Sequence, residues 1–207
     1  MPLKIRSRII ALSLLLCIKA TYSQSGINCY DVDETGIIKK AYNSFENDLF
    51  AHYKFGTDSI KTYRTFLAEV ASLSIDLRKL PSENSIRLAR EFKKIANNKN
   101  SLWIKLSEYE NNETITKVPP TNKKNQKELL IFNYRGGYIQ CLKNTTNSND
   151  FKDLISTLEK DGNVSTSLIS QKIYYITDKE LRTSGIKNFI AFDIYYSILM
   201  VIEKAFN

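Results

Sequence analysis

Only one histidine occurs in the chain, His52, and this limits the chemistry that its side chains could perform. Sites of the HExxH type and clusters of several histidines around a metal need more than one imidazole. A serine or cysteine nucleophile needs a nearby base, and only His52 could supply an imidazole. It lies on the apolar face of a predicted helix, one turn before the end, where packing or a favourable charge at the helix C-terminus is the simpler role. We therefore expect no metal site and no cofactor.

Asp193 is the residue best placed to act as an acid. It interrupts the stretch 186–206, in which 15 of 21 positions are apolar. A carboxyl group in such surroundings must be paired, hydrogen-bonded or protonated, because an unpaired buried charge destabilises the fold by several kcal/mol. One interpretation makes Asp193 an acid with a raised pKa in a pocket. The plainer interpretation, which we favour, gives this buried acid a lysine, arginine or tyrosine partner.

A basic face on the helix predicted over 82–97 is the clearest candidate for binding. Arg87, Arg90 and Lys94 share this face, with Glu83 and Glu91 interleaved among them. The mixed signs favour a solvated helix face. The functional alternative is a docking face for an acidic protein or an anionic surface polymer.

The N-terminal residues 1–23 have the layout of a secretory signal peptide. A basic start (KIRSR) precedes the apolar run 9–18, and the small Ser23 ends the segment. A lipoprotein signal would attach lipid at Cys17, but the bulky Leu16 before it is a poor match to the small residue expected there. We expect an exported protein, periplasmic or secreted, which removes nucleic acid as an ordinary partner.

Removal of the predicted signal changes the charge and leaves two cysteines. Four of the 30 lysines and arginines, and none of the 22 acidic residues, lie in 1–23, so residues 24–207 carry 26 basic against 22 acidic groups, a net charge of +4. Cys29 and Cys141 are the cysteines left. In an oxidising compartment they most simply form one disulfide. Closing a loop of about 100 residues would stabilise the fold by up to ~4.7 kcal/mol. Free buried thiols are the alternative.

The composition from residue 24 onward favours an all-α fold in a single domain, 24–207. Glycine and proline are scarce, at seven and four, whereas tyrosine and phenylalanine number 12 and 10. Apolar spacing of three and four residues indicates about eight helices in antiparallel pairs, packed around an apolar C-terminal helix. The predicted helices cover 34–55, 57–80, 82–97, 101–110, 127–147, 151–160, 165–176 and 186–206.

Two segments between these helices differ from the rest. The stretch near 111–126 contains two prolines and no apolar period, which predicts an exposed loop. The segment 127–147 fits either a helix or a hairpin, since two apolar runs flank Gly136 and Gly137. We favour the helix because an isolated hairpin has little stability and no other strand is predicted.

The C-terminal stretch is apolar enough to resemble a membrane span. Residues 186–202 are close to the minimum length for spanning a bilayer. Asp193 near their middle would cost ~2.5 to 3.5 kcal/mol on insertion scales. A buried helix is favoured, and we expect no stable membrane span after signal removal.

These features predict a non-catalytic exported protein that binds another protein, of an inhibitor or immunity-like kind. This function follows from class and compartment, because the chain contains no motif for a reaction. One alternative is a helical carrier of a small apolar ligand, which requires a cavity lined by Phe and Tyr. Another is a carboxylate-based envelope enzyme, which requires a cleft at Asp193.

Overall fold

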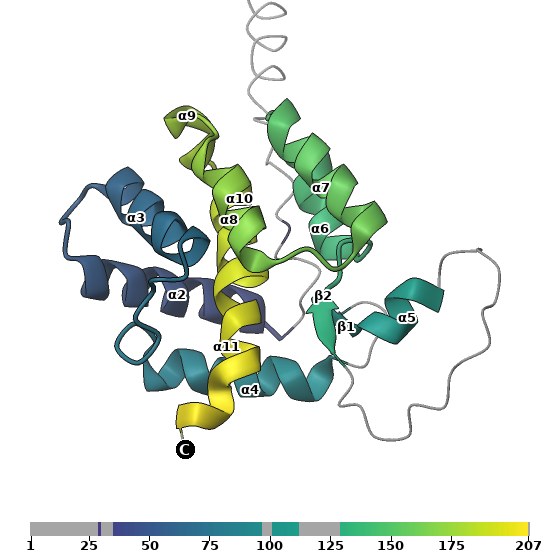
Figure 1. Cartoon of the computed structure of the whole chain (residues 1–207), viewed down its shortest axis with the longest axis horizontal. Helices are drawn as coiled ribbons and strands as arrows, with labels where there is room; N and C mark the ends of the chain where they lie inside the picture. The colour runs from purple at the N-terminus through teal and green to yellow at the C-terminus, as the bar shows by residue number, and fades with distance from the viewer. Residues whose placement is uncertain (1–28, 30–34, 97–100, 112–128, 207) are drawn as a thin grey trace, which may run out of the picture.

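The computed structural model describes residues 29, 35–96, 101–111 and 129–206, and these are mainly helical (Figure 1). The predicted all-α fold with an apolar C-terminal helix is confirmed, with a small two-stranded sheet added. The predicted signal peptide and almost all of the predicted loop near 111–126 lie outside the described residues, and both stay predictions.

The elements follow one another along the chain as labelled in Figure 1. They are α2 (Ile37–Tyr53), α3 (Ser59–Ala71), α4 (Glu83–Ile95), β1 (Trp103–Lys105), α5 (Leu106–Asn111), β2 (Leu130–Phe132), α6 (Gly137–Thr145), α7 (Asn149–Asp161), α8 (Thr166–Tyr174), α9 (Asp178–Leu181), α10 (Ser184–Phe189), the π-helix η3 (Ile190–Tyr196), α11 (Ser197–Ile202) and the 3₁₀ helix η4 (Glu203–Phe206).

The C-terminal stretch is the hub of this fold. The consecutive elements α10, η3 and α11 form one long helix, coloured in light green to yellow through the middle of Figure 1. All seven residues of η3 are buried. Helices α2, α4, α6 and α8 pack against this hub helix. A helix enclosed on several sides must be apolar nearly all round, which explains its composition.

The same helix is the one membrane-span candidate among the described residues. Ser184–Ile202 is long and apolar enough to cross a bilayer by length and composition. In the folded chain, however, 67% of the most apolar 18-residue stretch of this helix is buried. Such burial is expected for the core helix of a folded domain.

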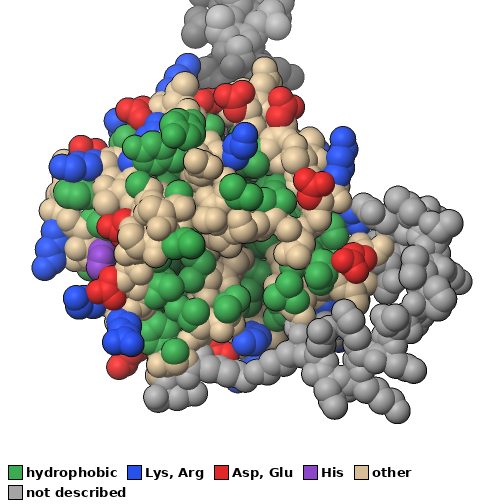
Figure 2. Space-filling model, in the orientation of Figure 1, with side chains coloured by type: hydrophobic (Ala, Val, Ile, Leu, Met, Phe, Trp, Pro, Cys, Tyr) green, Lys and Arg blue, Asp and Glu red, His purple; other side chains and the backbone are tan. Residues whose placement is uncertain are grey.

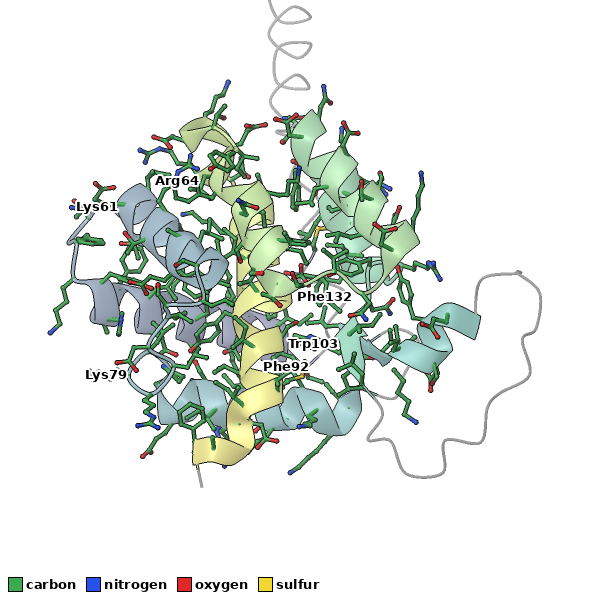
Figure 3. All side chains as sticks on the ribbon, in the orientation of Figure 1. Lys61, Arg64, Lys79, Phe92, Trp103 and Phe132 are labelled. Atoms are coloured by element: carbon green, nitrogen blue, oxygen red, sulfur yellow. A yellow bond between two sulfur atoms is a disulfide. The ribbon has the colours of Figure 1, made fainter. Side chains whose placement is uncertain are left out.

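Aromatic rings connect the small sheet to the helices around it (Figure 3). The Phe92 ring of α4 lies 4.9 Å from the Trp103 ring of β1, which lies 5.7 Å from the Phe132 ring of β2. Trp103 also donates from Nε1 to the Ser197 hydroxyl of α11 over 2.9 Å. Phe92 and Phe132 also contact rings of the hub helix, so the three aromatic side chains are buried together with it.

Several helix boundaries follow from local sequence signals. Asp58 caps α3 by accepting from the Lys61 amide, and Ser82 caps α4 by accepting from the Ser85 amide. At α9, Thr177 and Glu180 have the three-residue spacing of a capping box, and the structure contains both of its hydrogen bonds. Each of these interactions spans only three residues, which is why the sequence alone reveals them.

The end of α3 corrects one prediction, because the helix stops at Ala71 and does not continue to residue 80. Leu73, an apolar residue inside the predicted helix 57–80, has a φ of 57° and is 81% exposed. The Ser74 amide donates to the Glu69 carbonyl and the Leu73 amide to the Val70 carbonyl, which is the Schellman pattern that ends a helix. Glycine usually occupies the left-handed position of this motif, so a leucine there gives no sequence signal.

The segments 101–110 and 127–147 also differ from the predicted helices. Residues 103–105 and 130–132 pair as antiparallel strands, with Trp103 opposite Phe132 and Lys105 opposite Leu130. Helix α6 then begins at Gly137, and α5 begins at Leu106. For residues 130–136, both interpretations of the sequence were wrong, because this segment is neither a helix nor one half of a hairpin with its neighbours. The strand partner lies in a distant segment, so no local pattern could identify it.

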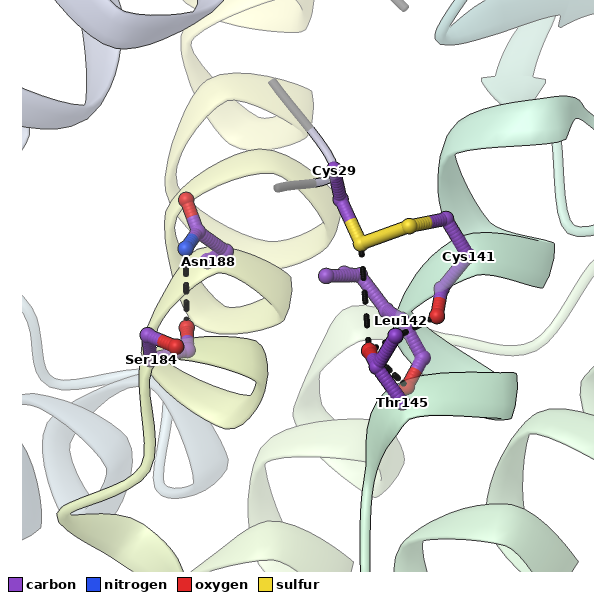
Figure 4. Close-up of a disulfide and its surroundings, with 6 residues drawn as sticks. All are labelled: Cys29, Cys141, Leu142, Thr145, Ser184 and Asn188. Atoms are coloured by element: carbon purple, nitrogen blue, oxygen red, sulfur yellow. Dashed lines mark hydrogen bonds between the residues drawn. A yellow bond between two sulfur atoms is a disulfide. The ribbon is translucent and has the colours of Figure 1, made fainter. Parts of the chain in front are cut away.

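The predicted disulfide between Cys29 and Cys141 is confirmed (Figure 4). The two Cα atoms are 5.7 Å apart, and the bond closes a sequence separation of 112 residues. It attaches Cys29, which precedes the first described helix, to α6 in the second half of the chain.

Candidate functional site

Asp193 lies in η3 and is only 3% exposed. The Tyr134 hydroxyl donates to its Oδ1 over 2.9 Å, whereas Oδ2 receives no hydrogen bond from the described residues. Burial raises the pKa of Asp193 to about 7, and the bond from Tyr134 opposes that rise in part. The group is therefore a weak acid that changes its charge near neutral pH.

A second buried carboxyl, Asp48 of α2, was not singled out in the sequence. The Tyr195 hydroxyl of η3 and the Ser82 amide at the start of α4 both donate to its Oδ2. Next to it, the Tyr196 hydroxyl donates to the Ala41 carbonyl over 3.0 Å. Burial, followed by the Asp48 carboxylate, raises the pKa of Tyr195, so its hydroxyl stays a donor. An acidic residue on the apolar face of a helix was the available signal for this cluster.

Both carboxyl groups are buried among the described residues. The pockets described below are bordered by other residues, and Asp193 and Asp48 are not among those that line them. General acid or base catalysis requires contact with the reacting group, directly or through one water. In the described residues the two acids connect parts of the core that are distant in the sequence, because Asp193 accepts from Tyr134 in the turn after β2 and Asp48 accepts from Tyr195 in η3.

The predicted basic face separates into two parts. Arg90 points toward the C-terminal end of the hub helix, with Nε 3.4 Å from the Glu203 carboxylate and Nη2 donating to the Glu203 carbonyl over 3.2 Å. Lys93 reaches the same carboxylate at 3.0 Å and the Met200 carbonyl at 2.9 Å. Arg90 therefore holds the end of the hub helix. Together these cations lower the pKa of Glu203 against the opposing effect of its burial.

Arg87 and Lys94 border a surface groove between the start of α2 and α4. This α2–α4 groove has a volume of about 430 Å³. Its apolar lining comes from Ile37, Leu88 and Ile95, and its charged lining from Lys40, Arg87, Glu91 and Lys94. Helix α4 positions these groups because its opposite face, with Ala89 and Phe92, packs into the core.

The charges around the α2–α4 groove are mainly positive. Arg87 pairs with Glu91 and also donates to the Asn84 side chain over 2.8 Å. Lys40 and Lys94 are exposed at the edges of the groove. Ile95 is 53% exposed although it is a large apolar residue. The groove thus combines apolar surface with an excess of basic groups, a combination suited to a partner with acidic and apolar side chains.

A larger pocket, with a volume of about 890 Å³, lies between α6, the start of α7, α9 and the start of α10. Serine, threonine and asparagine make up much of its lining. It differs from the aromatic cavity that a carrier of an apolar ligand requires. Its apolar contribution comes chiefly from Tyr138, Leu142 and Cys29.

The face drawn in Figure 2 gathers apolar side chains around its middle, over the hub helix, and charged side chains mostly toward its edges. Val201 of α11 is 72% exposed. Apolar atoms make up much of any protein surface, so single exposed residues do not indicate a partner.

No group of three or more His, Cys, Asp or Glu that could hold a metal occurs in the part of the chain that the structure describes. His52 packs its ring 4.8 Å from that of Tyr53 at the end of α2. Comparisons of the chain with protein-family models, with curated proteins and with solved structures give no match, so its function has to be inferred from its own residues and surfaces.

Proposed function

We propose that this chain is an exported protein-binding module, of the inhibitor or immunity-like kind, that docks an acidic segment of its partner in the α2–α4 groove. The observation that carries this proposal is the groove itself, where Arg87 and Lys94 stand beside the apolar Ile37, Leu88 and Ile95. Burying the apolar floor would supply affinity, and the basic rim would select and steer an acidic partner.

The arrangement of Arg90 supports this division of roles. Arg90 and Lys93 are engaged with Glu203, whose side chain is 8% exposed, so these cations stabilise the protein itself. Arg87 is bonded to Glu91 on the surface, where an exposed ion pair contributes little to stability. The groove cations are thus available for a partner at little cost to the fold.

The disulfide supports export. Bonds such as Cys29–Cys141 form and persist in oxidising compartments and are rare where thiols are kept reduced. An inhibitor or immunity-like protein that acts outside the cytoplasm also benefits from a covalent link between distant segments. The link limits the unfolded ensemble and so protects the protein where it cannot be refolded by chaperones.

The two alternative functions receive less support from the geometry. A carrier of a small apolar ligand needs a cavity among the aromatic rings, but the rings of Phe92, Phe192 and Tyr196 are almost completely buried in contact with one another. An enzyme centred on Asp193 needs a cleft at that residue, but Asp193 accepts from Tyr134 inside the core.

Affinity capture with charge-reversed variants tests the proposal. The variant Arg87→Glu/Lys94→Glu reverses two groove charges, and the control Lys160→Glu/Lys172→Glu makes the same charge change at exposed positions of α7 and α8. Each protein is used as bait in envelope extract, and bound proteins are quantified by mass spectrometry. We expect one stoichiometric acidic partner on the wild type and the control, reduced at least about tenfold on the groove variant.

Two results would contradict the proposal. Equal capture of the partner by the groove variant and the control would show that the α2–α4 groove is not the docking site. Absence of any stoichiometric protein on the wild type, even under gentle cross-linking, would show that the chain does not act by binding a protein in that extract.

A further inference from the structure

The pocket of about 890 Å³ beside the disulfide is distinct from the α2–α4 groove, and the two share no lining residue. Six hydroxyl side chains border it, and they belong to Thr145, Thr146, Ser148, Thr177, Thr183 and Ser184. Two carboxamides, Asn147 and Asn188, border it as well. Figure 4 shows Ser184 and Asn188 on the hub helix, across from Cys29, Leu142 and Thr145. We call it the hydroxyl-lined pocket.

Several hydroxyls of this pocket already donate their protons to the protein. Thr145 donates to the Cys141 carbonyl over 2.8 Å, and Thr183 donates to the Glu180 carbonyl over 2.7 Å. Thr177 donates to the Glu180 carboxylate over 2.7 Å. A hydroxyl has one proton and two lone pairs, so these three groups can offer a ligand only acceptor positions. The pocket therefore suits a ligand that is rich in hydrogen-bond donors.

The charges in the pocket add acceptors and nearly balance. Glu180 is kept ionised because hydrogen bonds from Ser148 and Thr177 lower its pKa. Asp150 is a second carboxylate, and Lys179 supplies a positive charge beside them. One of the two negative charges is therefore offset. This composition favours hydroxyl donors over a multiply charged ligand of either sign.

The hydroxyl-lined pocket also has an apolar floor. Leu142 and Tyr138 of α6 contribute to its lining, and the Tyr138 ring is fixed 5.6 Å from the Phe192 ring of the hub helix. The Asn188 amide is held on the opposite wall by donating to the Ser184 carbonyl over 2.8 Å. Positions that are fixed before binding reduce the entropy lost when a ligand binds.

We propose that this pocket binds an uncharged polyhydroxylated ligand of the size of a mono- or disaccharide. Such a ligand presents hydroxyl donors to the threonine and carboxylate oxygens, and its C–H faces can rest on Leu142 and Tyr138. The volume of about 890 Å³ lies within the usual range of roughly 300 to 1,000 Å³ for small-molecule sites. The proposal does not depend on the docking function, because it concerns other residues.

Gly185 provides a way to fill the pocket without disturbing the fold. It borders the pocket, and a Cβ added to it would meet no atom within 4 Å. Leucine is also a better helix former than glycine. Gly137 is a matched control, because it begins α6, does not line the pocket and is equally open around a new Cβ. Gly185→Leu should block the pocket, whereas Gly137→Leu should leave it open.

The test is a titration of the ¹⁵N-labelled, disulfide-bonded protein with cellobiose, maltose and N,N′-diacetylchitobiose. Each probe is raised to about 10 mM, enough to populate a site of millimolar affinity. We expect at least one probe to shift the amide signals of Asn147 and Gly185 saturably, without dependence on salt. Gly185→Leu should weaken that binding at least about tenfold, and Asn147→Ala about two- to tenfold by loss of one hydrogen bond. Gly137→Leu should bind like the wild type.

Three results would overturn the proposal. The first is the absence of saturable shifts at the pocket with all three probes. The second is equal binding by Gly185→Leu and Gly137→Leu, which would place the sugar elsewhere. The third comes from a parallel titration with spermidine, a polycation. If spermidine shifts the pocket signals, salt abolishes these shifts and none of the sugars binds, the pocket takes a cation. In the affinity capture with the groove variants, Gly185→Leu should behave as the wild type, so failure of one proposal leaves the other testable.

Discussion

The two buried carboxyl groups of the hub region, Asp48 and Asp193, differ in how completely they are hydrogen-bonded. Each accepts from a tyrosine hydroxyl, Tyr195 in the first case and Tyr134 in the second. Asp48 also accepts from the Ser82 amide at the start of α4, where the helix dipole favours a negative charge. Asp193 has one donor and an Oδ2 that receives none from the described residues.

This difference shows that burial alone does not determine the role of an acidic side chain. Asp48 joins α2, α4 and η3 through bonds that require an acceptor. Asp193 accepts one bond and is only 3% exposed, so its burial favours the protonated form. We therefore regard Asp48 as a structural anchor and Asp193 as a group whose ionisation opposes folding.

The largest expected effect is the pH dependence that Asp193 contributes. Its folded pKa is raised from 3.8 to about 7, so the folded state binds more protons than the unfolded state between these values. The stabilisation of the folded state that comes from protonated Asp193 is therefore fully present below about pH 4. It is lost as the pH rises to about 7. The loss amounts to roughly 4 kcal/mol.

Asp193→Asn isolates this contribution, because an amide does not titrate. Carboxylates with lowered pKa values, such as Glu203 and Glu180, act in the opposite direction in both proteins and cancel in the comparison. We expect the stability of the wild type minus that of Asp193→Asn to fall between pH 4 and 7, as measured by urea unfolding. A flat difference would mean that burial does not raise the pKa of Asp193 in the folded protein.

The second effect is the loss of the Asp48 anchor. Asp48→Ala leaves the Tyr195 hydroxyl and the Ser82 amide without their acceptor, and we expect the free energy of unfolding to fall by about 3 kcal/mol at pH 7. Asp48→Asn should cost less, because its carbonyl oxygen can take the position of Oδ2 and keep both bonds. If Asp48→Ala were as stable as the wild type, the anchor would have no energetic role.

The smallest effect separates the two parts of the basic face. Arg90→Ala removes a partner of the buried Glu203, and we expect a loss of about 1 to 2 kcal/mol. Arg87→Ala removes an exposed pair with Glu91 and should cost less than about 0.5 kcal/mol. Urea unfolding of the two variants at pH 7 measures the difference. Equal losses would contradict the assignment of Arg90 to the fold and of Arg87 to the docking groove.

The sequence by itself determined the features that depend on neighbouring residues. The apolar C-terminal helix, the caps at Asp58 and Ser82 and the capping box at Thr177 follow from side chains within one helical turn of each other. The Cys29–Cys141 bond was predictable for a different reason, since two cysteines were left to pair once the N-terminal segment had been set aside.

Tertiary structure decided the features that join distant segments. The pairing of residues 103–105 with 130–132 has no local signature, and the choice of Tyr134 as the donor to Asp193 depends on where that strand leads. The assignment of Arg90 to Glu203, while Arg87 borders the groove, depends on where the end of the hub helix crosses α4. Local propensity acts over a few residues, whereas these contacts are selected by the packing of the whole chain.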